Sequence, residues 1–368
     1  MNNYLDSVVG QERVIEILSN FIRSEQLPHA MLFSGPKNVG QHYTAKQLLK
    51  ELLAKNNANS GWFIQVDKLE EPLVKYIIPL PRGKGEKADD HSVEKLHDSE
   101  IEILQEEINK KIKNSFYQIS LENANNIKIT SIRDIKKYLS FNYSDLPYRL
   151  ILIEDAHLMG VEAQNALLKS LEEPPHGVFF VLITDKPEFL LSTIKSRCWE
   201  IPFAPLHDKD VEYILINNFD FNKDDVHKVI QFAEGSIYKV FELLNNDFEE
   251  LLDTTINILR YSLANKYNTS IKLFTNIIDN NPKIIFELII QLMINWFNDV
   301  QKIKAGDKNI HFIGYEDTVE KFVQKFPDTK IDEIIFKLTE LRKNIEYNIN
   351  LNLLVLNIIF NISSLVKR

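Results

Sequence analysis

Residues 35–42, which read GPKNVGQH, have the glycine spacing of a phosphate-binding loop. In such a loop, backbone N–H groups hold the phosphates, a lysine after the second glycine reaches the β- and γ-phosphates, and the next Ser or Thr holds Mg²⁺. Here Gly35 and Gly40 are kept, but Gln41 replaces the lysine and His42 replaces the hydroxyl residue. We therefore expect no productive nucleotide binding and no bound cofactor. A glycine-containing turn unrelated to phosphate is the alternative.

Two adjacent carboxylates, Glu154 and Asp155, follow the apolar run 150–153. Acids at the end of a buried strand can place Mg²⁺ and a water-orienting group beside a nucleotide. An ATPase of this kind usually has Asp first and Glu second, so the order here displaces both carboxylates. We interpret the pair as the relic of a metal site. Capping of the following helix and residual metal binding are the alternatives.

A second apolar run ends in Thr184 and Asp185, and the triplet Ser196-Arg197-Cys198 follows. The guanidinium fork of Arg197 is suited to phosphate oxygens, whereas a local salt bridge is the ordinary role of an arginine. The neighbouring Ser196 and Cys198 are interpreted as capping and packing residues. This part of the chain thus has one candidate for phosphate chemistry.

Metal and disulfide chemistry find little support in the sequence. Neither His42 nor His157 has partners at a ligand spacing, so we predict no metal site. Cys198 is the only cysteine, which excludes an intrachain disulfide and a cysteine-rich zinc site. A single cysteine also fits a reducing compartment.

The elements that must position these residues alternate between strands and helices over the first two hundred residues. This order predicts an α/β domain with a mostly parallel sheet. Short runs that are apolar throughout are typical of strands covered on both faces. We predict such strands at 30–33, 150–153 and 179–183, and helices at 43–53, 131–139 and 161–173.

Two stretches break this alternation. Residues 56–126 contain Pro79, Pro81, Gly83 and Gly85 and are read as an irregular insertion or elaborated connection, with a charged helix at about 99–113. After Pro202 and Pro205 strands are no longer expected, and the helical pattern continues to the end. We predict three domains, at 1–205, 206–245 and 246–368.

Composition describes an ordinary globular protein. The 368 residues are 44% hydrophobic, enough for two or three cores. The net charge of −9 does not favour nucleic acid, so any DNA contact must come from a local patch or a larger assembly. The N-terminus does not read as a signal peptide, and no apolar run is long enough to span a bilayer, so we expect a cytoplasmic protein.

Taken in chain order, these segments resemble the AAA+ subunits of the bacterial DNA polymerase III clamp loader, over roughly residues 5–245. The segments that carry the resemblance are Val9-Gly10-Gln11, Leu27-Pro28-His29-Ala30, 35–40, Glu154-Asp155-Ala156-His157, 165–175, Thr184-Asp185 and Ser196-Arg197-Cys198. The resemblance implies an AAA+ core with a parallel sheet, a small helical lid and an all-α collar that joins subunits into a ring.

Within that family the chain is similar to the subunit that completes the ring without hydrolysing ATP. The ATPase subunits keep the loop lysine and threonine, and they carry a lid arginine where this chain has Tyr238. By resemblance, Arg197 is the catalytic residue, acting in trans on ATP bound to a neighbour, while Thr184 and Asp185 occupy a nucleotide-sensing position. The family's four-cysteine zinc module is absent, and 56–126 takes its place.

The resemblance also implies a role in DNA replication and a set of partners. These are the ATPase subunits of gamma/tau type and the delta subunit, with the sliding clamp and primer–template DNA in the same complex. We expect no membrane contact and no enzymatic activity of the chain alone. The alternatives are an ATP-hydrolysing subunit or related AAA+ ATPase with an atypical loop, and a pure scaffold in which Arg197 has no catalytic role.

Overall fold

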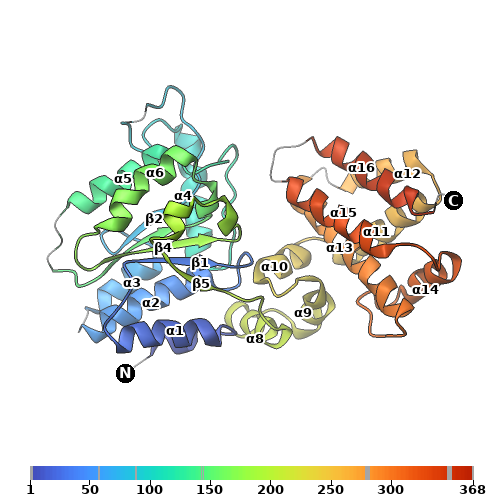
Figure 1. Cartoon of the computed structure of the whole chain (residues 1–368), viewed down its shortest axis with the longest axis horizontal. Helices are drawn as coiled ribbons and strands as arrows, with labels where there is room; N and C mark the ends of the chain where they lie inside the picture. Colours follow the sequence, from blue (N-terminus) through green and yellow to red (C-terminus); the bar gives the residue numbers. More distant parts are fainter. Residues whose placement is uncertain are drawn as a thin grey trace. The chain divides into compact units, whose positions relative to one another are not determined.

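The computed structural model describes residues 3–56, 59–87, 89–141, 143, 145–277, 282–345 and 350–366. The chain divides into two compact units (Figure 1). The first unit comprises Met1–Phe219 and Gly235–Tyr238, and the second comprises Asp220–Glu234 and Lys239–Arg368. The three-domain organisation predicted from the sequence stays a prediction.

A parallel sheet of five strands lies at the centre of the first unit. In sheet order the strands are β2 (Val74–Ile77), β3 (Arg149–Ile153), β4 (Val178–Thr184), β1 (Ala30–Ser34) and β5 (Trp199–Pro202). The three predicted apolar runs form the central strands β3, β4 and β1, and every residue of these strands is buried. The predicted α/β class with a parallel sheet is confirmed.

Helices cover both faces of this sheet, which is why the central strands are apolar throughout. Figure 1 shows α5 (Ile129–Ser140) and α6 (Val161–Glu172) on one face, and α1 (Glu12–Arg23) and α2 (Gln41–Lys55) on the other. Ala30 and Leu32 of β1 share a core with α5 and α6. The other helical segments of the unit are η1 (Tyr4–Ser7), α3 (Ser60–Asp67), α4 (Asp98–Lys113), η2 (Ala156–Leu158), η3 (Pro187–Phe189), α7 (Ser192–Lys195) and α8 (Asp208–Phe219).

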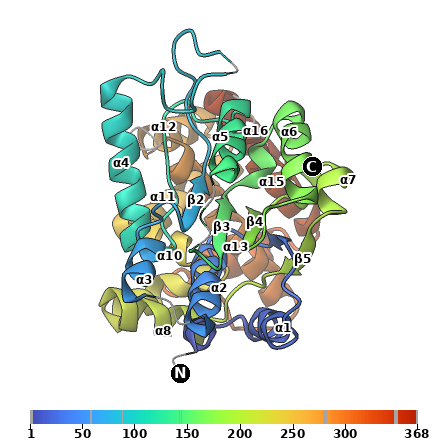
Figure 2. The ribbon, with the colours of Figure 1, turned by 90° about the vertical axis from the view of Figure 1, so that its left-hand side faces the viewer.

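The stretch 56–126 has more regular structure than its sequence indicates. The charged helix is present as α4, but α3 and the edge strand β2 were not predicted. β2 has only four residues, two of them half-buried, and it lies between Pro72 and Pro79. In Figure 2, α4 lies beside β2 at this edge of the sheet. The stretch therefore contributes the edge strand β2 to the sheet.

All regular elements in the described part of the second unit are helices, as the sequence predicts beyond Pro205. Its core includes four phenylalanines that are fully buried, Phe274, Phe286, Phe297 and Phe312. No described helix combines the length and the apolar character needed to cross a bilayer. The helical segments are α9 (Lys223–Val229), η4 (Ile230–Phe232), α10 (Ile237–Asn245, which begins in the first unit), α11 (Phe248–Leu263), α12 (Tyr267–Ile277), α13 (Pro282–Lys304), α14 (Glu316–Lys325), α15 (Ile331–Asn344) and α16 (Leu351–Ser364).

Candidate phosphate site

The predicted site residues of the core meet where β1, β3 and β4 end. These strands are parallel neighbours, so their carboxyl ends lie at one edge of the sheet. β1 leads into the loop 35–40, β3 into the two acids, and β4 into the Thr-Asp pair. One small cavity is lined by Gly35, Gly40, Gln41, His42, Glu154, Asp155, Thr184 and Asp185, among others. The structure thus brings these eight predicted residues together.

The two loop glycines are required by the backbone. Gly35 has φ +141°, and a Cβ there would lie 2.3 Å from the carbonyl oxygen of Phe203. Gly40 has φ +111° and caps the N-terminus of α2. Both positions favour glycine because L-residues rarely adopt such φ values. Glycine is therefore what the backbone favours at both ends of this loop, residues 35–40, which we call the cradle.

The side chain of Gln41 forms hydrogen bonds with two backbone groups of its own loop. Its Oε1 accepts a hydrogen bond from the backbone N–H of Val39 at 3.1 Å, and its Nε2 donates to the carbonyl oxygen of Pro36 at 2.6 Å. Gln11 holds the same turn from outside, donating to the carbonyl oxygen of Val39 at 3.1 Å. A loop N–H of the kind that would bind phosphate is thus already paired with a side chain of the loop.

Glu154 is surrounded by donors from three parts of the chain. Lys111 of α4 donates to Oε1 at 2.6 Å, while His42 Nδ1 lies 3.3 Å from Oε2 and the Tyr76 hydroxyl also donates to Oε2. The Lys111 side chain has no exposed surface, and its ammonium also donates to the carbonyl oxygen of Tyr117 at 2.8 Å. Both carboxylate oxygens of Glu154 are therefore occupied by protein groups.

The electrostatics of this cluster follow from burial and from Lys111. Burial alone would raise the pKa of Glu154, but the Lys111 ammonium and His42 hold it well below its usual range. Burial and the nearby ammonium lower the pKa of His42 to about 4, so the imidazole is neutral near pH 7. Because an ionised carboxylate only accepts, Nδ1 of His42 carries the proton. Lys111 supplies the positive charge that a metal ion would bring to Glu154.

Gln118 covers what remains of the cradle. Its Oε1 accepts from Asn38 Nδ2 and its Nε2 donates to Asp155 Oδ2, both at 3.1 Å. The remaining cavity has a volume of about 20 Å³, which is room for one water molecule. Small-molecule sites usually measure hundreds of cubic ångströms. The cavity that remains is far smaller than such a site.

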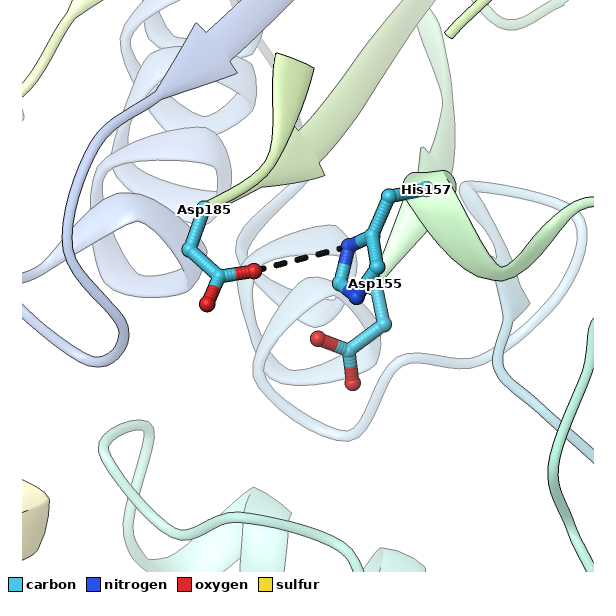
Figure 3. A group of neighbouring side chains, drawn as sticks. All are labelled: Asp155, His157 and Asp185. Carbon is cyan, nitrogen blue, oxygen red and sulfur yellow. Dashed lines mark ion pairs between the residues drawn. The ribbon is translucent and has the colours of Figure 1, made fainter. Parts of the chain in front are cut away.

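A second group of ionisable residues lies beside the cradle (Figure 3). Ligating atoms of Asp155, His157 and Asp185 lie within 4.8 Å of one another. His157 Nδ1 is 3.5 Å from Asp185 Oδ1 and 3.0 Å from the hydroxyl of Thr184, and burial lowers the pKa of this imidazole. No partner of His157 at a ligand spacing is visible in the sequence, because Asp185 comes from the next strand. Lys186 adjoins the group and partly offsets its negative charge, and we assign no metal to it.

Arg197 forms a local salt bridge at the end of α7. Its Nε donates to Glu172 Oε1 at 2.7 Å, and one terminal nitrogen donates to the carbonyl oxygen of Thr193 at 2.9 Å. The arginine side chain is 33% exposed and the Glu172 side chain 45% exposed. Trp199, two residues further on, is also largely exposed. The trans-acting role of Arg197 stays a prediction.

The remaining predicted positions have structural contacts. Cys198 packs against the core, and burial raises the pKa of its thiol to about 12, so it is an unreactive packing residue. Ser196 donates to a carbonyl oxygen of α7 at 3.2 Å. Tyr238 is half-buried at the start of α10, and Ser236 before it donates to the carbonyl oxygen of Lys37 at 3.1 Å.

The residues that sequence reasoning missed all come from the stretch 56–126. They are Tyr76, Lys111 and Gln118. One signal was present: the apolar face of α4 repeats at Ile101, Leu104 and Ile108, and Lys111 takes the next position on that face. A lysine in such a position needs a buried acidic partner.

The chain is also similar in sequence to known proteins. The family described as "DNA polymerase III, delta subunit" matches residues 10–207, more than half of the chain. The chain is 26% identical over 352 residues to DNA polymerase III subunit delta' of Bacillus subtilis (strain 168), covering 92% of each protein.

Two further relatives match over shorter regions. Subunit tau of Bacillus subtilis is 28% identical over 257 residues, which is 70% of this chain and 38% of tau. Subunit gamma of Buchnera aphidicola is 25% identical over 248 residues, which is 66% of this chain and 58% of gamma. The chain thus spans less than two thirds of the length of tau and gamma.

Proposed function

Because the chain belongs to the DNA polymerase III delta subunit family, we propose that it is a clamp-loader subunit of the delta-prime type that works without binding or hydrolysing ATP. In this proposal it acts with gamma/tau-type ATPase subunits and delta to load the sliding clamp onto primed DNA. The observation that carries the non-hydrolysing part is the phosphate cradle, which is filled by side chains of the chain itself.

A nucleotide would have to displace groups that are already well paired. Phosphate binding at the loop would require Gln41 to release the Val39 N–H, and Mg²⁺ at Glu154 would have to displace Lys111. Removing one partner of a buried ion pair costs about 3–5 kcal/mol. The rival reading, an ATP-hydrolysing subunit with an atypical loop, requires the chain to meet this cost without a loop lysine.

Calorimetric titration of the full chain with Mg-ATP tests the proposal. We expect no binding tighter than about 1 mM, while a gamma/tau-type subunit in the same buffer should bind. Restoring Gln41→Lys and His42→Thr together should recover weak binding at most, because Lys111 and Gln118 stay in place. Micromolar binding by the unchanged chain would overturn the proposal.

We further propose that Arg197 reaches ATP bound to a neighbouring gamma/tau-type subunit. Both side chains of its present salt bridge are partly exposed, and such pairs stabilise a protein by only about 0–1 kcal/mol. Releasing the Arg197 guanidinium from Glu172 therefore costs little free energy. The exposed Trp199 nearby suits a surface that becomes covered on assembly.

The second unit, in this proposal, holds the ring together. Large apolar side chains are exposed on it at Ile313, Phe336, Leu353 and Phe360. Phe336 belongs to α15, and Leu353 and Phe360 belong to α16. Permanent subunit interfaces are formed largely by apolar side chains that are exposed in the single chain.

The double substitution Phe336→Ser and Leu353→Ser tests this assignment. Because both side chains are exposed, the fold should be kept, while the affinity for partner subunits should fall at least about tenfold. Gel filtration of the reconstituted complex measures the loss. Ile103→Ser, at an exposed apolar position of α4, is the matched control and should assemble normally. If both variants assemble equally well, these helices do not form the interface.

A further inference from the structure

A groove in the second unit lies between α11, α13 and α14. Eleven of the described residues line it, and its volume is about 430 Å³. Its aromatic part is a row of three rings, with centroids 5.3 Å apart between Trp296 and Phe322 and 5.2 Å apart between Phe322 and Phe326. Four residues at α11 complete the apolar lining: Ile256, Leu259, Leu263 and Ala264. Leu263, Ala264 and Phe326 present the accessible apolar surface, and the other apolar residues form the buried floor. The groove is large enough to take several apolar side chains.

The charged residues of the groove have one sign. Arg260, Lys321 and Lys325 line it, and none of the described residues lining it is acidic. This contrasts with the whole chain, which carries a net charge of −9. Lys321 pairs with Asp317, but both side chains are at least three quarters exposed, so the pair is easily exchanged. Lys325 lies over the ring of Phe326, with its Nζ 5.3 Å from the centroid.

The polar groups of the groove do not favour a small molecule. Ligand sites usually orient their ligand with a few convergent polar groups. The neutral polar side chain here is Thr318, which accepts from Trp296 Nε1 at 3.2 Å and donates to the carbonyl oxygen of Tyr315 at 2.7 Å. Recognition must therefore come from apolar contact and from the cationic rim.

We propose that this groove binds an acidic amphipathic helix of a partner protein. A helix with one apolar face places side chains at i, i+3, i+4 and i+7 into an apolar groove. Acidic residues flanking that face would meet the three cations of the rim. The inference goes beyond the proposed role in clamp loading and does not depend on the nucleotide site.

The first test uses a synthetic amphipathic helix as probe. The peptide has about four turns, Leu and Phe on one face, Asp and Glu elsewhere, and a fluorescent label. Its anisotropy is measured with the full chain at physiological salt, where we expect micromolar binding. The double variant Arg260→Glu and Lys325→Glu should weaken binding at least about tenfold. Lys308→Glu makes the same kind of charge change at an exposed residue outside the groove and should leave binding unchanged.

A charge swap and an apolar substitution complete the test. A peptide with Lys in place of Asp and Glu should prefer the charge-reversed groove to the wild-type groove. Leu263→Ser, at a half-buried lining position, should also weaken binding of the acidic peptide. Absence of binding, or equal losses in the groove variants and in Lys308→Glu, would overturn the proposal. Self-association that the groove variants abolish would do so too, because the occupant would then be a second copy of the chain.

Discussion

Replacing Lys111 with methionine is expected to lower the free energy of unfolding of the first unit by about 3–5 kcal/mol. The ammonium has no exposed surface and donates to Glu154, which is itself buried. Methionine keeps most of the volume but leaves that carboxylate without its cation. Urea unfolding, followed by circular dichroism and by the fluorescence of Trp62 and Trp199 in the first unit, measures the change.

Two further variants separate the ion pair from other effects of the substitution. Lys110→Met, at the preceding residue, removes a more than half exposed ammonium from the buried Glu107. Glu107 keeps hydrogen bonds from the Tyr117 hydroxyl and the Ser120 N–H, so this variant should lose less stability than Lys111→Met. Glu154→Gln added to Lys111→Met should recover part of the lost stability, because no unpaired charge remains. Equal effects of Lys110→Met and Lys111→Met would contradict the role given to this pair.

The free energy of unfolding should depend differently on pH in the wild type and in Lys111→Met. In the wild type, Glu154 and His42 both have folded pKa values below their ordinary ones, so each stabilises at higher pH and its contribution is lost as pH falls. For His42 this loss extends from its ordinary value of 6.5 down to about 4. In Lys111→Met the ammonium that lowers the pKa of His42 is gone, and the Glu154 carboxylate remains. We therefore expect the pKa of His42 to rise, so that the protonated imidazole pairs with Glu154 and stabilises the folded variant at lower pH. The stability difference should therefore shrink as pH falls from about 8 to about 5.

Arg197→Ala should leave assembly intact and impair the work of a partner. Trans-acting arginines in other phosphoryl-transfer systems contribute about 10³–10⁵ in rate. Only one of several ATP sites would depend on Arg197, so total ATPase of the complex should fall partially, and clamp loading onto primed DNA should fall further. Arg197→Lys should rescue poorly, because an ammonium lacks the planar fork. The measurement is clamp- and DNA-stimulated ATPase of a reconstituted complex, with gel filtration as the check on assembly.

The salt bridge to Glu172 provides a matched control for this experiment. Glu172→Gln removes the local partner of Arg197 but keeps the guanidinium. If Arg197 acts in trans, this variant should keep full activity. If the arginine serves only its local salt bridge, Glu172→Gln and Arg197→Ala should have the same effect. Unchanged loading by Arg197→Ala in an intact complex would leave the chain a scaffold.

The parts of the fold that could be predicted are those whose signal is local. The central strands are runs of four or more buried apolar residues. Because neighbouring residues of a strand point to opposite faces, such a run indicates that both faces are buried. The edge strand β2 includes the half-buried Lys75 and Tyr76, and β5 is exposed at Trp199 and Glu200. Short strands with such mixed burial owe their pairing to the rest of the sheet, which no local pattern records.

The candidate site shows the same division. The glycines, the replaced loop residues and the acids could be found because their motifs have fixed spacing. What fills the cradle could not, because Lys111 and Gln118 reach it from a separate part of the chain. The sequence therefore indicated which residues of the motif are replaced and did not reveal which side chains from elsewhere reach the loop.

The filled cradle also bears on how such a site changes over evolutionary time. Lysine at position 41 would deprive the Val39 N–H of its acceptor, threonine at 42 would take a donor from Glu154, and loss of Lys111 would strand a buried carboxylate. Each of these single changes would leave a buried polar group without its partner, at a cost of about 1–3 kcal/mol or more. We therefore expect each of these three changes to lower stability, so selection for stability would tend to preserve the present arrangement.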